Sequence, residues 1–446
     1  MSCNWPNVAL GKYCSKIGSG ATPKGGNSVY LDSGEITLIR SQNIYNEGFK
    51  SDGLVYITPE AAQKLKNVII EPNDVLINIT GDSVARVCLA PKEHLPARVN
   101  QHVAIIRVDP KEFDHRYLRY YLTSLKMQSY LLTIASSGAT RNALTKSMLE
   151  SLEVSKPPLD IQKKIGDVLE QFENKIQLNT QTNQTLEEMA QAIFKSWFVD
   201  FDPVKAKMNG EQPEGMDAAT ASLFPEKLVE SELGLIPEGW DAGTVGSVTA
   251  AKGGYAFKSK QFVDEGNPVI KIKNITSAGT VTTSDCQCVD DDIAKTASRF
   301  KLSDGDLLMA MTGATVGKSG IYVSDGRDGY LNQRVARFES KVDSTQPCWF
   351  TYNLVNKDSI FEQIVGAAQG SAQPNISSKG IEQVKTVIPT FDLISKYQEL
   401  VAPLYAKWIS NFRENSQLSE LRDTLLPKLL SGEIELGQTE EMAEVS

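Results

Sequence analysis

The chain has 446 residues, of which 41% are hydrophobic and 23% are charged, so it can form two or three globular domains with cores of their own. No stretch approaches the roughly 20 apolar residues that cross a bilayer, and the first residues lack the apolar run of a signal peptide, so we expect a cytoplasmic protein. The six cysteines are scattered, which argues against both a disulfide framework and a zinc site.

The net charge of −9 is unevenly placed along the chain. Residues 1–158 carry more basic than acidic side chains, and residues 241–390 are balanced, whereas the segments that follow each of them are acidic. DNA responds to local patches of charge rather than to the sum over a chain. The composition therefore permits DNA binding without predicting it.

Residues 1–158 and 239–390 are two copies of one pattern, offset by about 232 residues. The segment NDVLINITGDSVARV from Asn73 aligns with GDLLMAMTGATVGKS from Gly305, and the Asn-Gln pair at Asn100 aligns with the pair at Asn332. We therefore predict an α+β fold with two repeated domains of mixed α/β structure, each followed by a long helix. Further matching stretches are NWPNVALGKY with GWDAGTVGSV, ITLIRSQNI with NPVIKIKNI, and SSGATRNALT with AQGSAQPNIS.

The long helices are predicted over residues 159–203 and 391–431, where apolar residues recur at steps of four and three. Both carry two asparagines at matching places in this seam, and buried asparagines fix the register and orientation of paired helices. We therefore predict an antiparallel coiled coil; the alternative is that each seam packs only on its own domain. Pro403 should kink the second helix unless the regular helix begins there. The predicted seam residues are Ile165, Leu169, Phe172, Ile176, Asn179, Asn183, Leu186, Ile193, Trp197, Tyr397, Val401, Leu404, Trp408, Asn411, Asn415, Leu418 and Leu425.

Two further segments complete the chain. Residues 204–238 are rich in proline, glycine and acidic side chains, which predicts a partly ordered connector between the two copies. Residues 432–446 form an acidic tail, which we expect to fray.

The stretch TGATVGKS, Thr312–Ser319, resembles a phosphate-binding loop, but its spacing and context differ from one. Such a loop has four residues between its two glycines and opens a helix, whereas only three residues separate Gly313 from Gly317 and the following sequence predicts a strand. A nucleotide-hydrolysing enzyme is therefore the weaker alternative. None of the three histidines has metal-ligand spacing, and His102, whose counterpart is Arg334, is expected to be a polar rim residue rather than a general base.

Four segments are the most specific in the chain: PPLDIQKKI (157–165), MAQAIFKSWFVDFDPVKAKMNG (189–210), SELGLIPEGW (231–240) and LRDTLLPKLLSGEI (421–434). They resemble segments of the DNA-specificity subunit of type I restriction–modification enzymes, and the resemblance extends over essentially the whole chain. It implies that each domain is a target-recognition domain that reads one half of a split, asymmetric DNA site, while the helices set the spacing and dock two methyltransferase (modification) subunits. The second copy departs from the first at Ser395, which stands near the position equivalent to Gln162.

The same resemblance implies that this chain is not itself an enzyme and carries no cofactor or metal. The modification subunits would bind S-adenosylmethionine and methylate adenine, and separate restriction or motor subunits would use ATP and Mg²⁺ to cleave DNA. The other alternative is an assembly scaffold whose globular units bind protein rather than DNA. Catalytic residues are accordingly not predicted in this chain.

Residues that read bases are expected where the two copies differ, beside the turns that they share. The shared pairs Thr80-Gly81 with Thr312-Gly313, and Asn100-Gln101 with Asn332-Gln333, are expected to be scaffold or to face phosphates. Arg, Lys, Asn and Gln match base edges in the major groove, although each could instead contact phosphate or only solvent. The candidates are Lys24, Arg40, Gln42, Arg86, Arg141 and Asn142 in the first domain, and Lys258, Lys271, Lys273, Lys318, Arg334 and Gln373 in the second.

Overall fold

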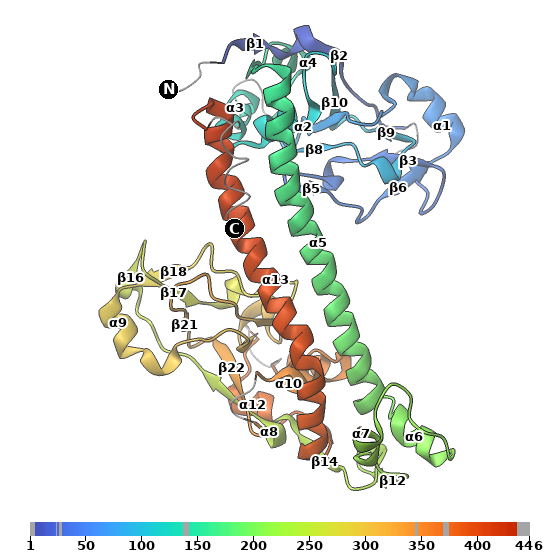
Figure 1. Cartoon of the computed structure of the whole chain (residues 1–446), viewed down its shortest axis with the longest axis vertical. Coiled ribbons are helices and arrows are strands. Elements are labelled where there is room, and N and C mark those ends of the chain that lie inside the picture. Colours follow the sequence, from blue (N-terminus) through green and yellow to red (C-terminus); the bar gives the residue numbers. More distant parts are fainter. Residues whose placement is uncertain are drawn as a thin grey trace. The chain divides into compact units, whose positions relative to one another are not determined.

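The computed structural model describes residues 5–23, 25, 29–136, 142–343, 347–368 and 374–434. The chain divides into two compact units, one made of Met1–Lys175 with Leu418–Ser446 and the other of Ile176–Gln417. Each unit contains one of the repeated domains. Two long helices, α5 (Leu159–Phe198) and α13 (Phe391–Ser431), each contribute residues to both units (Figure 1).

The first domain is built on a four-stranded antiparallel sheet of order β2-β10-β7-β8 and a three-stranded sheet of order β6-β3-β9, in which β3 and β9 are parallel. The two central strands of the larger sheet are almost wholly buried, because successive side chains enter different cores. Val75 and Ile77 lie in one core with the helices, and Leu76 lies in another with the smaller sheet. The strands are β1 (Asn7–Ala9), β2 (Cys14–Ser19), β3 (Ile36–Ile39), β4 (Ile44–Tyr45), β5 (Gly48–Phe49), β6 (Val55–Ile57), β7 (Val75–Asn78), β8 (Val87–Leu89), β9 (Ala97–Val99), β10 (Val103–Val108) and β11 (Glu153–Ser155).

The helices of the first domain begin at side chains that accept backbone N–H groups. Asp114 caps the second helix through the N–H groups of Arg116 and Tyr117, and Thr145 caps the fourth through Met148. The first strand, β1, pairs with the last, β11, so the domain closes on itself before the long helix begins. The helices are α1 (Pro59–Lys64), α2 (His115–Thr123), α3 (Leu125–Ser136) and α4 (Lys146–Glu150).

The second domain repeats this topology, which confirms the predicted internal repeat. Its sheet β15-β22-β19-β20 matches β2-β10-β7-β8, and the parallel pair of β17 and β21 matches β3 and β9. A bridge between Thr80 and Ala143 recurs between Thr312 and Asn375. Each residue of the second bridge lies 232 positions after its counterpart in the first. The elements are β14 (Asp241–Thr244), α8 (Val245–Val248), β15 (Thr249–Gly253), β16 (Phe262–Val263), β17 (Asn267–Ile270), β18 (Gln287–Val289), α9 (Asp291–Thr296), β19 (Leu307–Ala310), β20 (Ser319–Ile321), β21 (Tyr330–Leu331), β22 (Val335–Ser340), α10 (Trp349–Val355), α11 (Asp358–Ala368), α12 (Ser378–Glu382) and β23 (Lys385–Ile388).

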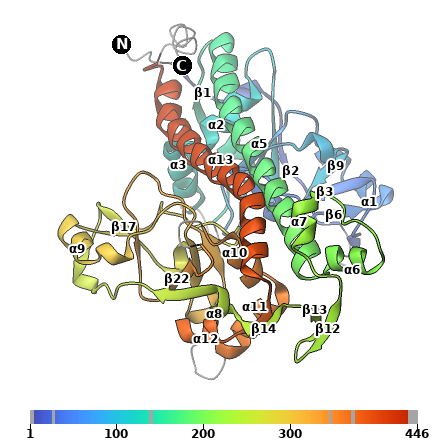
Figure 2. The same ribbon diagram turned by 60° about the horizontal axis from the view of Figure 1, so that its bottom comes forward.

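The first long helix ends earlier than predicted. It stops at Phe198 rather than at residue 203, because Phe201 adopts a left-handed conformation with φ of 55° before the short helix α6 (Asp202–Met208) begins. The predicted connector is more ordered than expected, since it also holds α7 (Ala218–Ser222) and the hairpin of β12 (Leu228–Ser231) and β13 (Gly234–Pro237), which Figure 2 shows beyond the end of α5. Val204 and Phe224 of this segment are buried in the core of the second unit.

The two long helices are paired and antiparallel, as the seam predicted. Within the second unit, the amide of Asn179 donates to Asn415 Oδ1 at 3.0 Å, and the amide of Asn411 donates to Asn183 Oδ1 at 2.9 Å. Moving along α5 towards its C-terminus therefore means moving towards the N-terminus of α13, and Figures 1 and 2 both show the helices side by side. The seam residues are all buried or half-buried.

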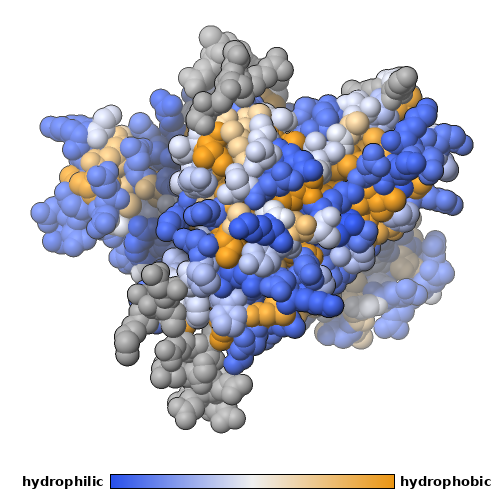
Figure 3. All heavy atoms as spheres, turned by 90° about the horizontal axis from the view of Figure 1, so that it is seen from above, coloured by the Kyte–Doolittle hydropathy of each residue, from blue (hydrophilic) through white to orange (hydrophobic). Residues whose placement is uncertain are grey.

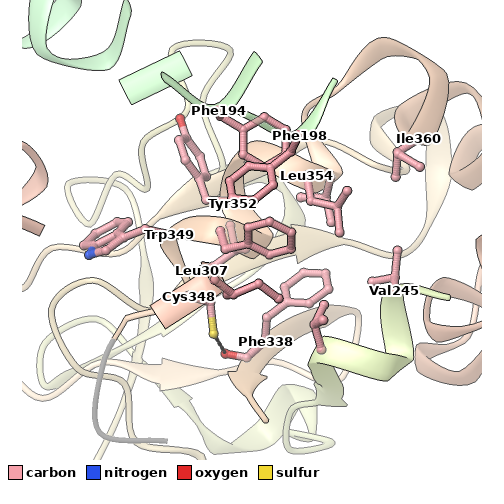
Figure 4. Close-up of a cluster of buried hydrophobic side chains, with 14 of the residues drawn as sticks. Phe194, Phe198, Val245, Leu307, Phe338, Cys348, Trp349, Tyr352, Leu354 and Ile360 are labelled. Atoms are coloured by element: carbon pink, nitrogen blue, oxygen red, sulfur yellow. Dashed lines mark hydrogen bonds between the residues drawn. The ribbon is translucent and has the colours of Figure 1, made fainter. Parts of the chain in front are cut away.

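The alternative packing of the seam is also present, because each unit buries the ends of both helices in its core. Phe194 and Phe198 near the end of α5 point into the core of the second unit beside Tyr352 and Leu354 (Figure 4). In the first unit, Leu169 of α5 lies in one core with residues from the end of α13. The residues of that end of α13 are Leu425, Leu426, Leu429 and Leu430.

The regular part of the second long helix, predicted over 391–431, does not begin at Pro403. The helix α13 starts at Phe391 and continues through this exposed proline. At the start of α5, Gln162 is fully buried and fixes the helix to its own domain: its amide donates to the carbonyls of Glu112 and Pro157, and its Oε1 accepts the N–H of Asp114. The difference between Gln162 in the first copy and Ser395 in the second therefore affects a contact inside the protein.

The surface mixes polar and apolar residues. The face in Figure 3 shows hydrophobic residues in small groups between hydrophilic ones. In the part of the chain that the structure describes, none of the helices combines the length and the apolar character that crossing a bilayer requires.

Candidate nucleic-acid interface

Two turns meet at one end of the four-stranded sheet in the first domain. The turn at Thr80 follows β7, and the turn at Gln101 and His102 precedes β10. The N–H of Ile79 donates to the carbonyl of His102 at 2.9 Å, which ties the turns together. A row of side-chain hydrogen bonds then links Thr22 to Gln101 Oε1, Gln101 Nε2 to His102 Nε2 at 2.9 Å, and His102 Nδ1 to the Thr80 hydroxyl. Thr22 and Gln101 are exposed, so the row lies at the surface.

A third segment joins these turns. The N–H of Gly81 donates to the carbonyl of Asn142 at 3.4 Å, beside the bridge between Thr80 and Ala143. Asn142 is exposed, and it is a predicted DNA-binding residue that the fold brings to this place. We call this surface the turn cluster; in the first domain it consists of Thr22, Thr80, Gly81, Gln101, His102 and Asn142.

The second domain contains the same cluster with different side chains. The N–H of Met311 donates to the carbonyl of Arg334 at 3.0 Å, and the N–H of Gly313 donates to the carbonyl of Pro374 at 2.9 Å. Arg334 therefore stands where the first domain has His102, and Pro374 stands where it has Asn142. The second turn cluster consists of Thr312, Gly313, Gln333, Arg334 and Pro374.

A glycine in each domain, directly after β2 or β15, lets the chain approach the Asn-Gln turn. A Cβ on Gly20 would lie 1.7 Å from the carbonyl oxygen of Val99, and a Cβ on Gly254 would lie 2.2 Å from that of Leu331. Only glycine fits either position, because the obstructing atoms belong to the backbone. Thr22 and Ala256 correspond in the alignment of the two domains, since each comes two residues after its glycine.

The predicted residues Arg40 and Gln42 lie beside the turn cluster rather than in it. Both donate to the carbonyl of Gly53, at 2.5 and 3.3 Å, and the Arg40 guanidinium lies 5.4 Å from the ring centre of Tyr30. Their loop is tied to the end of β7, since the amide of Asn78 donates to the Ser41 carbonyl at 2.9 Å. These contacts leave Gln42 exposed and Arg40 half-buried.

Arg86 belongs to a cationic group on an aromatic ring. Its guanidinium lies 4.7 Å from the ring centre of Tyr45, and the ammonium of Lys50 lies 4.3 Å from the same centre. Lys50 was not among the sequence candidates, because nothing in the sequence shows that it meets Tyr45 and Arg86. Such a group could contact phosphate or stack on a base.

Three lysines of the second domain occupy places equivalent to first-domain candidates. Lys273 and Lys258 are exposed, and the Lys258 N–H donates to Gln261 Oε1 at 2.7 Å. Lys271 is half-buried: its ammonium lies 3.7 Å from the ring centre of Phe262 and donates to Gln287. Burial, followed by the nearby charge of Lys273, lowers the pKa of Lys271 below its usual value.

Lys318 has different surroundings from the other candidates. It lines a hollow of about 480 Å³ in the second unit, together with Glu187 and Glu188 of α5. This place is adjacent to the long helix, and it is not part of the turn cluster. Whether Lys318 reads DNA therefore stays a prediction without support from the cluster geometry.

Three candidates, Lys24, Arg141 and Gln373, lie outside the described residues. Most residues of the turn cluster, Thr22 and His102 among them, were absent from the DNA-binding candidates. Thr22 could have been found by aligning Gly20 with Gly254, and His102 was expected only to be a rim residue. The signal for His102 was present in the sequence, because it differs from Arg334 directly after a shared pair.

The structure does not support a phosphate-binding loop at Thr312–Ser319. This loop connects strand β19 to strand β20, as predicted, so no helix follows its second glycine. In the chain as far as it is described, no group of three His, Cys, Asp or Glu side chains could hold a metal ion.

Comparisons with known proteins bear on this geometry. A family model described as the type I restriction modification DNA specificity domain matches residues 4–188 and 237–395, one match for each repeated domain. The chain belongs to this family. It is a DNA-specificity subunit, which is the non-catalytic component of type I restriction–modification enzymes, as the sequence resemblance implied.

Individual relatives agree with the family match. The chain is 28% identical to the HindI specificity subunit of Haemophilus influenzae over 361 residues, which cover 71% of this chain and 77% of that one. It is 24% identical to the MjaIX specificity subunit of Methanocaldococcus jannaschii, with 95% and 92% of the two chains covered. The crystal structure of the S subunit from M. genitalium matches with a TM-score of 0.57 and 16% identity over 96% of both chains, which shows a shared fold.

Proposed function

We propose that each repeated domain of this specificity subunit reads one half of a bipartite, asymmetric DNA site, and that α5 and α13 together set the spacing of the halves. The observation that carries the proposal is the repeated turn cluster. One backbone arrangement presents Gln101, His102 and Asn142 in one domain and Gln333, Arg334 and Pro374 in the other. A shared scaffold with different exposed side chains suits two different half-sites.

The helix pair supports a role as a spacer. With 40 residues, α5 has a length of about 60 Å, which corresponds to roughly 17 base pairs of B-form DNA. The asparagine contacts also obey a local two-fold relation, because Asn183 donates to the carbonyl of Trp408 while Asn415 donates to that of Ile176. A two-fold relation between the helices is compatible with reading two half-sites, as dimeric DNA-binding proteins do.

We further propose that exposed apolar residues on the long helices help to dock the methyltransferase subunits. Leu178 and Met189 on α5 are 58% and 49% exposed, and Leu400 and Leu421 on α13 are both 46% exposed. Their exposure on otherwise polar helix faces is typical of a surface that another subunit covers. These partners would bind S-adenosylmethionine, and restriction subunits would bind ATP and Mg²⁺. A cytoplasmic location follows from this function.

The test is to co-express the chain with its modification subunits and to map methylated adenines across the genome. We expect one bipartite motif with two different halves. A second variant, in which residues 239–431 are replaced by another copy of residues 5–198, should methylate a site whose halves are inverted repeats of the first half-site, because the local two-fold makes the helix ends equivalent. Methylation without any sequence motif would favour a protein-binding scaffold instead. The same conclusion would follow if the amount of DNA that the complex retains did not fall as the salt concentration rises.

A further inference from the structure

We infer that the residue after the shared Asn-Gln pair switches which side chain reads the base: His102 fixes Gln101 to read adenine in the first half-site, and Arg334 itself reads guanine in the second. This inference rests on the proposed function. Gln101 and Arg334 would contact bases, while His102 and Thr22 would act as positioning residues. It assigns different roles to Gln101 and Gln333, which are identical residues at equivalent places in the two domains.

The backbones of the two turns are equivalent. The buried amide oxygen of Asn100 accepts the N–H of His102 at 3.0 Å, and that of Asn332 accepts the N–H of Arg334 at 3.2 Å. The His102 carbonyl accepts the N–H of Ile79 at 2.9 Å. The Arg334 carbonyl accepts the N–H of Met311 at 3.0 Å. The side chains of His102 and Arg334 therefore leave the backbone at the same point of the same turn.

In the first domain, neighbouring side chains hold both ends of the Gln101 amide. Thr22 donates to its oxygen, and its nitrogen donates to His102 Nε2. His102 then has its proton on Nδ1, where it donates to the Thr80 hydroxyl. The amide keeps one N–H and one oxygen lone pair for a ligand. This donor and acceptor pair is complementary to the N7 and N6 positions of adenine in the major groove.

In the second domain, these restraints are gone. Ala256 stands in place of Thr22, and Arg334 stands in place of His102, so neither former partner can hold Gln333, which is exposed. The Thr312 hydroxyl, equivalent to that of Thr80, is buried without a hydrogen-bond partner among the described residues. The Arg334 side chain is exposed, and within the described part of the chain no hydrogen bond or ion pair engages its guanidinium.

The chemistry of these groups selects the bases. A free guanidinium presents two parallel N–H donors, which match O6 and N7 of guanine. A glutamine amide reads adenine well only when its plane is fixed, because an unrestrained amide can rotate to present either edge. The first domain supplies that restraint through Thr22 and His102. The second domain lacks it and has the longer cationic side chain of Arg334 at the place of His102. The difference between the half-sites thus includes one adenine and one guanine at equivalent places.

The experiment is adenine-methylation mapping with the full complex, using the variants Gln101→Ala, His102→Ala and Arg334→Ala. We expect Q101A to reduce discrimination about ten-fold or more at one adenine of the first half-site only, and R334A to do the same at one guanine of the second. H102A should relax the same position as Q101A but less strongly, and H102Q should restore part of the preference because its amide can again accept from Gln101. A folding defect alone would lower methylation at every site and would not change one position.

Matched controls are the exposed Gln63→Ala in the first domain and Arg299→Ala in the second, which lie outside both turn clusters and should leave the motif unchanged. Thermal unfolding of each variant shows whether it folds, and Arg334→Lys provides a second variant that keeps the charge but loses the paired donors. Uniform loss of methylation with an unchanged motif in folded Q101A and R334A would identify phosphate contacts and overturn the inference. A wild-type motif that is not bipartite would overturn the proposed function itself.

Discussion

Asn411 donates a hydrogen bond to Asn183 at 2.9 Å across the two long helices, and Asn179 and Asn415 form the matching contact at 3.0 Å. Three of these four side chains are at most 9% exposed. Asn179 also donates to Glu414 at 2.8 Å, so the layer is linked to a charged group at its edge. An apolar seam would tolerate other alignments of the helices, whereas these amide hydrogen bonds form in one alignment only.

Replacing Asn411 with alanine should lower the free energy of unfolding by about 1–3 kcal/mol, because it leaves the buried amide of Asn183 without its donor. The double variant N183A/N411A should cost less than the sum of the single variants, since neither partner is then left alone. Urea unfolding of the two single variants and the double variant measures this coupling. Thr185→Ala, on the exposed face of α5, is the control, and additive effects of N183A and N411A would contradict a direct contact.

The architecture could be predicted from the sequence because it repeats and because its helices have a regular seam. The alignment of Thr80 with Thr312 is reproduced by the bridges that these residues make, and every predicted seam position is buried or half-buried. The early end of α5 could not be predicted, because the left-handed conformation of Phe201 is rare for a bulky residue and has no sequence signal.

The candidate site was predicted only in part. The repeat led to the two turns that the fold brings together, but it did not show that Gln101 and Gln333 have different side-chain neighbours. Gln101 depends on Thr22, which is 79 residues away in the chain, so its environment appears only after folding. Similarly, Arg40 donates a hydrogen bond to the carbonyl of Gly53, and neither its charge nor its place in the sequence indicates this tertiary contact.

Glycine at positions 20 and 254 should be essential for stability. Gly20→Ala and Gly254→Ala would each place a Cβ within about 2 Å of a backbone carbonyl, so the strand must move away from the Asn-Gln turn. We expect each substitution to lower the free energy of unfolding by about 3 kcal/mol or more. Chemical denaturation of the purified variants measures the loss.

Two other glycines provide controls for these substitutions. A Cβ on Gly18 of β2 or on Gly366 of α11 would meet nothing within 4 Å. G18A should therefore be nearly neutral, and G366A should stabilise the protein by about 1 kcal/mol because alanine is the better helix former. Equal losses for G20A and G18A would show that the close approach at Gly20 does not matter.

The stability of the first domain should depend on the protonation of His115 at the start of α2. Burial lowers the pKa of this imidazole; Arg116 and Lys92 lower it further, whereas Asp114 and Glu170 raise it. The unfolded state therefore binds a proton at a higher pH than the folded state. The free energy of unfolding should fall as the pH drops through the usual titration range of histidine and should recover above it.

His115→Gln should flatten this part of the pH profile, because glutamine cannot take up the proton. Urea unfolding between about pH 5 and pH 8 gives the two profiles, and their difference removes the contribution of carboxylates that titrate in both proteins. A positive charge at this place would also oppose the positive end of the helix dipole, which adds to the expected slope. Identical slopes for the two proteins would mean that His115 is not the group responsible.

The spacing of the half-sites should follow the length of the paired helices. Adding seven residues with the seam pattern to both helices, between Phe172 and Ile176 in α5 and between Asn415 and Leu418 in α13, keeps the apolar seam in phase. It lengthens the pair by about 10 Å, or roughly three base pairs. We expect methylation mapping to show a spacer longer by that amount, with both half-sites unchanged. Methylation should be weaker, because added base pairs also rotate the duplex and the DNA must twist to compensate.

Two controls separate length from disruption of the helices. Replacing seven residues at the same place by seven others with the same pattern should leave the spacer unchanged. Adding seven residues to α5 alone shifts one side of the seam against its partner, so the contacts on that side are lost and the protein should be unstable. If the doubly extended protein folds and still methylates sites with the original spacer, the helices do not set the distance, and the spacing must be determined by the modification subunits.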